Sequence, residues 1–302
     1  MRLRDTTRAA LAPAARALTV FNLAWYELLA IFLILAGEGL IFAGHSVLGV
    51  RLSVLGVGLQ VLNIIAVAVI VVALQGERVE LVLALALISM FRVISASLAL
   101  VPIIYSLAIV LVMYLPLILV IPTVALYSEV AVYGVMFIPI IAIVAHRKLS
   151  RHDLGLTGGL RLAYLIPFGT LVGVGLGLIE YAILRNNALI PNASASELIG
   201  LSIVMIFFVA VVEELLFRVL LQPQLIERSG AVAGILITSV IFGALHGGYG
   251  NVYELLFTTG AGVVFGVAFY KTKNLPFVIT IHAVDDILLY GVFPFLSLAL
   301  LH

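Results

Sequence analysis

The chain has 302 residues, of which 64% are hydrophobic and only 10% are charged, and its mean hydropathy is +1.29. A soluble domain is about half apolar and about a quarter charged, so this composition excludes an ordinary soluble protein and places the chain in a lipid bilayer. The 16 basic and 15 acidic residues nearly balance, which gives no reason to expect nucleic acid as a partner, and the absence of cysteine excludes disulfides, thiolate zinc sites and cysteine nucleophiles.

Long apolar runs follow one another along the whole chain. A membrane-spanning helix needs about 20 mostly apolar residues, and these continuous runs lack the period of two of a β-barrel strand. The first run is too long for the apolar core of a cleaved signal peptide, so we expect a retained helix. The fold class predicted is all-α, a polytopic transmembrane bundle of about 8–10 helices. The predicted helices cover residues 18–43, 52–74, 79–100, 103–126, 130–145 (a short one), 161–184, 198–221, 231–247, 252–270 and 276–300.

A polar stretch at 146–161, HRKLSRHDLGLTGGLR, divides the chain. We expect an amino-terminal unit of unknown role at 1–147 and a carboxy-terminal unit at 148–302. Because basic loops tend to stay cytoplasmic, the arginine-rich start, this stretch and the turns at 227–228 and 271–273 are all predicted to lie inside. The start agrees with the other three only if an even number of helices precedes residue 146, whereas the runs above give five.

Several other features of the runs predict helix packing. Gly169, Gly173 and Gly177 recur every four residues, a spacing that lets two helices approach closely in lipid. Isolated ionisable residues occur inside apolar runs, and we expect them to form structural pairs, with Arg92 next to Glu27 or Glu38; the set is Glu27, Glu38, Arg92 and Glu180.

Three polar clusters differ from these isolated residues, because all three occur within the carboxy-terminal third of the chain. They are EELLFR at 213–218, FGALH at 242–246 and HAVDD at 282–286. Glu214 and Arg218 are four residues apart, so they share a helix face and are predicted to pair. Glu213 lies about 100° around the helix and is free to point elsewhere.

The spacing of these clusters predicts their depth in the membrane. Glu213 lies sixteen residues before Ser229, and His246 lies sixteen residues after Gly230. At about 1.5 Å per residue, two antiparallel helices joined at that turn bring Glu213 and His246 to the same level. His282 follows the 271–274 turn closely, so we expect it to lie nearer the cytoplasmic surface.

The motifs EExxxR, FxxxH and HxxxD, in this order, resemble the CPBP family of intramembrane proteases, which includes the CAAX prenyl endopeptidases of the Rce1 type and bacteriocin-processing proteins. DLGL at 153–156 is a further similarity, and the resemblance covers about residues 148–300. It implies hydrolysis of a peptide bond by a water molecule that a glutamate activates. In that scheme Glu213 is the general base, His246 orients the water, and His282 and Asp286 stabilise the oxyanion. The residues expected to support them are Glu214, Arg218, Phe242 and Asp285.

Asp286 needs separate treatment, because an ionised carboxylate cannot donate a hydrogen bond to an oxyanion. It must therefore be protonated, or its role is to orient His282, which lies four residues earlier on the same helix face. Asp285 competes for that contact. The chemistry itself is reasonable, since a carboxylate in a dry cavity is a stronger base and a histidine N–H acts strongly on a developing charge there.

The expected partner is a membrane-associated peptide or protein, with a prenylated CAAX tail as the best-known substrate of the family, and the cavity is expected to open towards the cytoplasm. No cofactor is favoured. One alternative is a zinc peptidase with Glu213, His246 and His282 as ligands, a legitimate catalytic set, although HExxH is missing. Another is a non-catalytic interaction protein or a proton-coupled carrier, since Glu and His within membranes also build proton relays.

Overall fold

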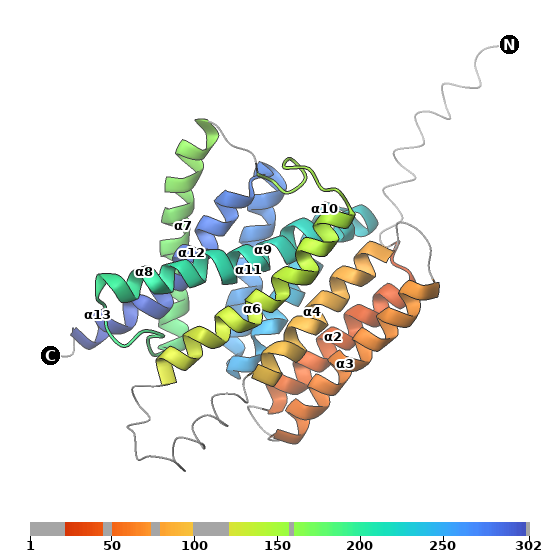
Figure 1. Cartoon of the computed structure of the whole chain (residues 1–302), viewed down its shortest axis with the longest axis horizontal. Helices are drawn as coiled ribbons and strands as arrows, with labels where there is room; N and C mark the ends of the chain where they lie inside the picture. The colour runs from red at the N-terminus through yellow and green to blue at the C-terminus, as the bar shows by residue number, and fades with distance from the viewer. Residues whose placement is uncertain (1–21, 45–49, 74–78, 99–120, 157–159, 300–302) are drawn as a thin grey trace.

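The computed structural model describes residues 22–44, 50–73, 79–98, 121–156 and 160–299, and the regular structure within these ranges is entirely helical (Figure 1). In the described ranges, eight helical stretches are long and apolar enough to cross a membrane. The predicted all-α, polytopic architecture is therefore confirmed. The protein is a multi-pass membrane protein.

The amino-terminal half contributes α2 (Trp25–Ala43), α3 (Val50–Ala73), α4 (Val79–Leu98) and α6 (Ile121–His146). The short run predicted at 130–145 is thus part of a helix of 26 residues. Most of the predicted helix 103–126 lies outside the described residues, and its last part, 121–126, belongs to α6. Four described helices, an even number, precede the polar stretch.

Buried hydrogen bonds and an ion pair connect α2, α3 and α4. Gln60 on α3 donates to Glu38 on α2 at 3.0 Å and accepts from Ser89 on α4 at 2.7 Å. Arg92 pairs with Glu38 at 2.7 Å, which confirms one of its two predicted partners. Glu27 pairs instead with Arg228, at 2.8 Å, so it links α2 to the carboxy-terminal half. Because hydrocarbon offers no hydrogen bonds, such paired groups stabilise the bundle where isolated ones would not.

The carboxy-terminal half begins with α7 (Leu160–Leu184). A continuous helix follows, made of α8 (Ala195–Ile203), η3 (Val204–Ala210), α9 (Val211–Glu214), η4 (Leu215–Leu221) and the start of α10 (Gln222–Ala244). The chain reverses at Gly230, whose φ of 81° and ψ of 165° suit glycine and break the helix at the predicted turn. The remaining elements are η5 (Leu245–Tyr249), α11 (Val252–Thr272), α12 (Leu275–Gly291) and α13 (Phe293–Ala299).

The helix predicted at 276–300 is interrupted, since α12 ends at Gly291 and α13 begins at Phe293. Pro294 has no N–H to donate to the carbonyl of Tyr290, as a continuous helix would require. That carbonyl accepts a hydrogen bond from the Leu189 N–H at 3.0 Å instead. The break therefore ties the α7–α8 connection to the end of α12.

The basic loops gather at one end of the bundle, the top of Figure 1. Arg228 contacts the first turn of α2, Arg147 pairs with Glu80 at 2.7 Å, and the Leu275 N–H donates to the Gly155 carbonyl at 2.9 Å. We call this the basic end; it carries Arg147, Lys148, Arg151, Arg228, Lys271 and Lys273. The beginning of α2 lies there too, so the start of the described chain and the three basic loops are at the same end. That this end is cytoplasmic stays a prediction.

The glycine ridge of α7 packs on α12, as its spacing predicts. A Cβ atom at Gly173 would lie 2.5 Å from the carbonyl oxygen of Ile281, the residue before His282. Only a glycine permits such an approach, because real Cβ atoms do not come so close to a backbone oxygen. The contact between α7 and α12 thus fixes the position of the helix that carries His282.

Candidate active site

Glu213 and Glu214 lie in the single α-helical turn of α9, between two stretches with wider, π-helical turns. Such turns are rare and occur frequently at functional sites, because they rotate the side chains that follow. Both carboxylates are buried, Glu213 with 7% and Glu214 with 0% of its surface exposed. Two buried carboxyl groups in succession require partners, and each has a different set.

Glu214 is held by Arg218, as predicted. The Arg218 Nε donates to Glu214 Oε2 at 2.8 Å, and both side chains are fully buried. The guanidinium is surrounded by three aromatic rings, of Phe217, Phe242 and Phe265, with centroids at 5.9, 5.2 and 5.6 Å. Cation–π attraction stabilises a desolvated guanidinium in such surroundings. Phe242, the first residue of the FxxxH motif, is therefore a wall of the arginine site.

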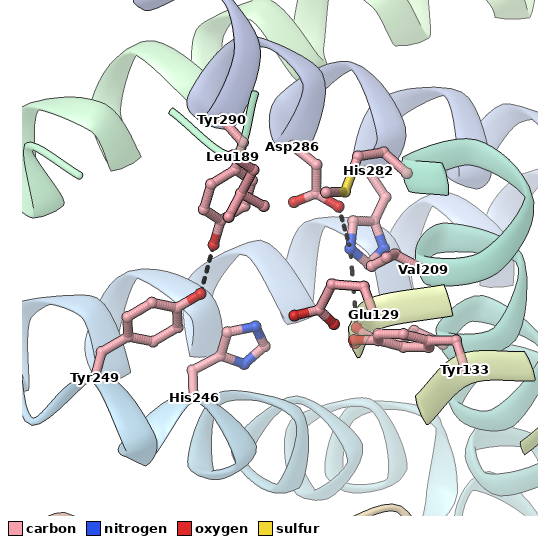
Figure 2. Close-up of a pocket in the computed structure, with 11 residues that line it drawn as sticks. Glu129, Tyr133, Leu189, Val209, His246, Tyr249, His282, Asp286 and Tyr290 are labelled. Carbon is pink, nitrogen blue, oxygen red and sulfur yellow. Dashed lines mark hydrogen bonds and ion pairs between the residues drawn. The ribbon is translucent and has the colours of Figure 1, made fainter. Parts of the chain in front are cut away.

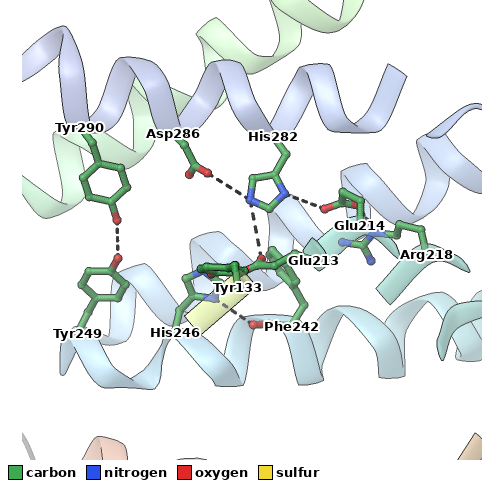
Figure 3. A network of polar contacts seen from close by, with 10 residues as sticks. All are labelled: Tyr133, Glu213, Glu214, Arg218, Phe242, His246, Tyr249, His282, Asp286 and Tyr290. Atoms are coloured by element: carbon green, nitrogen blue, oxygen red, sulfur yellow. Dashed lines mark hydrogen bonds and ion pairs between the residues drawn. The ribbon is translucent and has the colours of Figure 1, made fainter. Parts of the chain in front are cut away.

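His282 is held by Glu214 as well. Its Nδ1 donates to Glu214 Oε1 at 2.8 Å, so the two oxygens of one carboxylate bind Arg218 and His282 (Figure 3). Its Nε2 lies 3.5 Å from Asp286 Oδ2 and 3.8 Å from Glu213 Oε2. The ring therefore has two carboxylates at its two nitrogens, Glu214 at hydrogen-bond distance from Nδ1 and Asp286 at a longer distance from Nε2. That Asp286 orients His282 stays a prediction.

His246 has a defined orientation too. Its Nδ1 lies 3.0 Å from the carbonyl oxygen of Phe242, and since a carbonyl only accepts, Nδ1 carries the proton. In the neutral ring Nε2 then offers a lone pair. The neighbouring carbonyl of Leu245 accepts a hydrogen bond from Arg92, so the amino-terminal half anchors the backbone next to His246.

Glu213, His246 and His282 line one cavity of about 240 Å³ (Figure 2). This confirms the predicted common level of Glu213 and His246. The expectation that His282 lies nearer the surface than Glu213, which came from its short distance to the 271–274 turn, is wrong, because its Nε2 lies 3.8 Å from Glu213 Oε2. The other lining residues are Glu129, Tyr133, Leu189, Met205, Val209, Tyr249, Asp286 and Tyr290.

Two lining residues from α6 were missed by the sequence reasoning. Tyr133 donates from its hydroxyl to Glu213 Oε1 at 2.5 Å, and Glu129, one helical turn earlier, faces the same cavity. A signal existed: Glu129 and Tyr133 share a helix face, and an ionisable residue within a spanning helix is a functional candidate. The predicted helix began at residue 130, which left Glu129 outside it.

Asp285 does not contribute to the cavity. It is buried and faces α7, where a Cβ atom at Gly177 would lie 3.2 Å from its Oδ1. Its predicted competition with Asp286 for His282 is therefore absent, because the two aspartates point to different helices. Among the residues that the structure describes, no group of three or more His, Asp or Glu side chains is arranged to hold a metal ion.

The fold and the cavity together define a multi-pass membrane protein with a buried carboxylate and two histidines in one polar cavity. Residues 195–288 match the family described as type II CAAX prenyl endopeptidase Rce1-like. This segment runs from α8 into α12 and contains all three motifs, so the match supports the resemblance to Rce1-type proteases of the CPBP family, which is based on the motifs. Neither the curated proteins nor the solved structures contain a significant match to the chain.

Proposed function

We propose that this protein hydrolyses a peptide bond of a membrane-associated peptide with a water molecule that Glu213 activates. The observation that carries the proposal is the placement of the two Glu213 oxygens. Oε1 is held by the Tyr133 hydroxyl, whereas Oε2 is buried without a hydrogen-bond partner among the described residues, on the cavity that His246 and His282 share. A general base needs such an oriented, unoccupied acceptor.

His246 completes the site for the water. With Nδ1 bound to the Phe242 carbonyl, its Nε2 accepts one hydrogen of the water while Glu213 accepts the other. Glu213 takes a proton as the water oxygen bonds to the carbonyl carbon of the substrate. The same proton then passes to the amide nitrogen as the C–N bond breaks, which leaves a carboxylic acid, an amine and an ionised Glu213.

His282 supplies the charge that the oxyanion requires. Its ring lies among the carboxylates of Glu213, Glu214 and Asp286, an arrangement that suits a positively charged imidazolium. Nδ1–H is bound to Glu214, so Nε2–H is the donor available to the oxyanion. Asp286 Oδ2 lies 3.5 Å from Nε2, and an ionised Asp286 cannot itself donate to the oxyanion.

The substrate is tested by cleavage of peptides by the purified protein in liposomes. A prenylated CAAX peptide and its unprenylated twin are compared, with Glu213→Ala as the control, and products are identified by mass spectrometry. Cleavage of the prenylated peptide alone supports a CAAX-type substrate, and cleavage of both supports a broader peptide substrate. If neither is cleaved, nor any other membrane-anchored peptide tried, the proposed hydrolysis is wrong.

The zinc alternative keeps one supporting observation, since His246, His282 and Glu213 all face one cavity. A chelator separates the two mechanisms. Hydrolysis by Glu213 and water alone predicts an unchanged rate after exhaustive chelation. Loss of activity that added zinc restores would establish a metallopeptidase instead.

A further inference from the structure

A buried polar network in the amino-terminal half ends at the turn that carries His246. Glu38 on α2 is 2% exposed, and its carboxylate receives a hydrogen bond from the Arg92 Nε at 2.8 Å and lies 2.7 Å from the Arg92 Nη2. Gln60 on α3 donates to the same carboxylate at 3.0 Å and accepts from Ser89 on α4. Three helices therefore fix the position of one guanidinium.

The same guanidinium reaches into the carboxy-terminal half. Its Nη2 donates to the carbonyl oxygen of Leu245, in the 3₁₀ turn η5 that follows α10. Carbonyl groups at the end of a helix carry a partial negative charge, so they attract a cation. The Leu245 carbonyl belongs to the planar peptide unit that includes the nitrogen and Cα atoms of His246. Arg92 therefore holds the backbone from which the His246 ring projects.

The orientation of the His246 ring depends on this backbone. Its Nδ1 lies 3.0 Å from the Phe242 carbonyl oxygen, one helical turn earlier, and this bond determines which ring nitrogen faces the cavity. α2 packs on the same turn, since a Cβ atom at Gly247 would lie 3.4 Å from the Glu38 carbonyl oxygen. A rotation of the peptide unit that joins Leu245 to His246 would move the ring within the cavity. A displacement of about 1 Å in an active site can lower the rate about 100-fold.

We infer that Arg92 is a positioning residue of the active site, which holds His246 in place through the Leu245 carbonyl. The inference rests on the proposed function, in which His246 binds the water. It gives a role to the amino-terminal half, since Arg92 and its partner Glu38 lie outside the segment 195–288 that matches the Rce1-like family. The pair is then part of the catalytic unit as well as a contact between helices.

A second ion pair provides a matched control that separates positioning from packing. Arg228 and Glu27 also join α2 to the carboxy-terminal half, at 2.8 Å. Their side chains are 10% and 0% exposed, against 11% and 1% for Arg92 and Glu38. The control pair lies at the basic end, away from η5. Arg92→Gln and Arg228→Gln should therefore lower thermal stability in detergent by similar amounts.

The catalytic effects of the two changes should differ. The measurement is kcat and KM for peptide cleavage in liposomes by the natural protein and by both variants. Arg92→Gln should lower kcat about 10- to 100-fold with KM unchanged, because the Leu245 carbonyl loses a hydrogen bond from a charged donor. Arg228→Gln should keep the natural kcat. Equal kcat values for the two variants would overturn the inference and leave Arg92 with a packing role alone.

Arg92→Lys keeps the test decisive if Arg92→Gln does not fold. A lysine retains the ion pair with Glu38, but a point charge lacks the planar fork that serves the carboxylate and the Leu245 carbonyl together. We expect this variant to be nearly as stable as the natural protein and to have a lower kcat. A natural kcat in Arg92→Lys would overturn the inference.

A spectroscopic measurement tests the positioning without hydrolysis. The nitrogen NMR signals of the His246 ring are assigned by their loss in His246→Gln. Arg92→Gln or Arg92→Lys should shift these signals, and Arg228→Gln should not; unshifted signals in the Arg92 variants would overturn the inference. If the signals shift as expected and the natural protein cleaves no peptide, the positioning of His246 stands and the proposed function fails.

Discussion

Arg218→Ala is the change that most severely tests the interior of the site. Arg218 is fully buried and supplies a hydrogen bond to Glu214 and a cation to three aromatic rings. Its removal leaves Glu214 buried with only His282 as partner. Breaking a buried pair in this way costs about 3–5 kcal/mol. Against a typical free energy of unfolding of about 5–15 kcal/mol, that is a large fraction.

Arg147 provides a matched control. Its ion pair with Glu80 is 2.7 Å long, close to the 2.8 Å of the pair between Arg218 and Glu214, but it is partly exposed. Exposed pairs contribute about 0–1 kcal/mol, so Arg147→Ala should lower stability only slightly. The measurement is loss of helical circular dichroism in detergent micelles, against temperature and against denaturant. The reasoning is refuted if Arg218→Ala is no less stable than Arg147→Ala.

A double variant separates stability from catalysis. Glu214→Gln with Arg218→Met removes both charges, and replacing a buried pair by uncharged side chains of similar volume is often neutral or stabilising. We expect most of the lost stability to return. Cleavage should stay low, because His282 Nδ1 no longer has an ionised partner. Recovery of full activity in the double variant would contradict the role given to Glu214.

Three further changes give graded results. Tyr133→Phe removes a hydrogen bond to a charged group, so kcat should fall about 10- to 100-fold with KM unchanged, and an unchanged kcat would exclude Tyr133 from positioning Glu213. Gly173→Ala should destabilise the protein by about 1–3 kcal/mol in thermal unfolding, because the new Cβ atom would lie 2.5 Å from the Ile281 carbonyl oxygen. Gly175→Ala is the control and should cause no such loss, since no atom lies within 4 Å of its Cβ position. Equal effects of the two changes would contradict the packing of α7 on α12. Asp286→Asn should keep the cleavage rate within about tenfold, because Glu214 holds His282 Nδ1 and an amide oxygen can still accept from Nε2. A larger loss would show a direct role for the Asp286 carboxyl group.

The sequence predicted the features that depend on local spacing. Glu214 and Arg218 pair because residues four apart lie about one helical turn from each other. Glu213 and His246 reach the same level because each lies sixteen residues from the turn at Ser229 and Gly230. The α7 glycines contact α12 because small residues every four positions form a ridge. Each of these inferences needs only the geometry of one helix or one helical hairpin.

The features that the sequence did not predict depend on the packing of helices far apart along the chain. Tyr133 binds Glu213 across 80 residues, and Glu214 binds His282 across 68. The wider turns on either side of α9 also escape a periodicity of 3.6 residues, although they determine where both glutamates point. Local spacing indicated the contact of Asp286 with His282 Nε2, and it could not indicate that Glu214, from another helix, binds Nδ1.

The central claim is that Glu213 is the base that activates the water. The most direct measurement is the single-turnover rate of peptide cleavage in liposomes for the natural protein, Glu213→Gln and Glu227→Gln. Glu227 is the matched control, since its side chain is 72% exposed and lies at the Gly230 turn, away from the cavity. A general base contributes about 10²- to 10⁴-fold, so Glu213→Gln should lose that factor while Glu227→Gln keeps the natural rate. A rate for Glu213→Gln within a few-fold of the natural rate, in a protein that folds normally, would contradict the account.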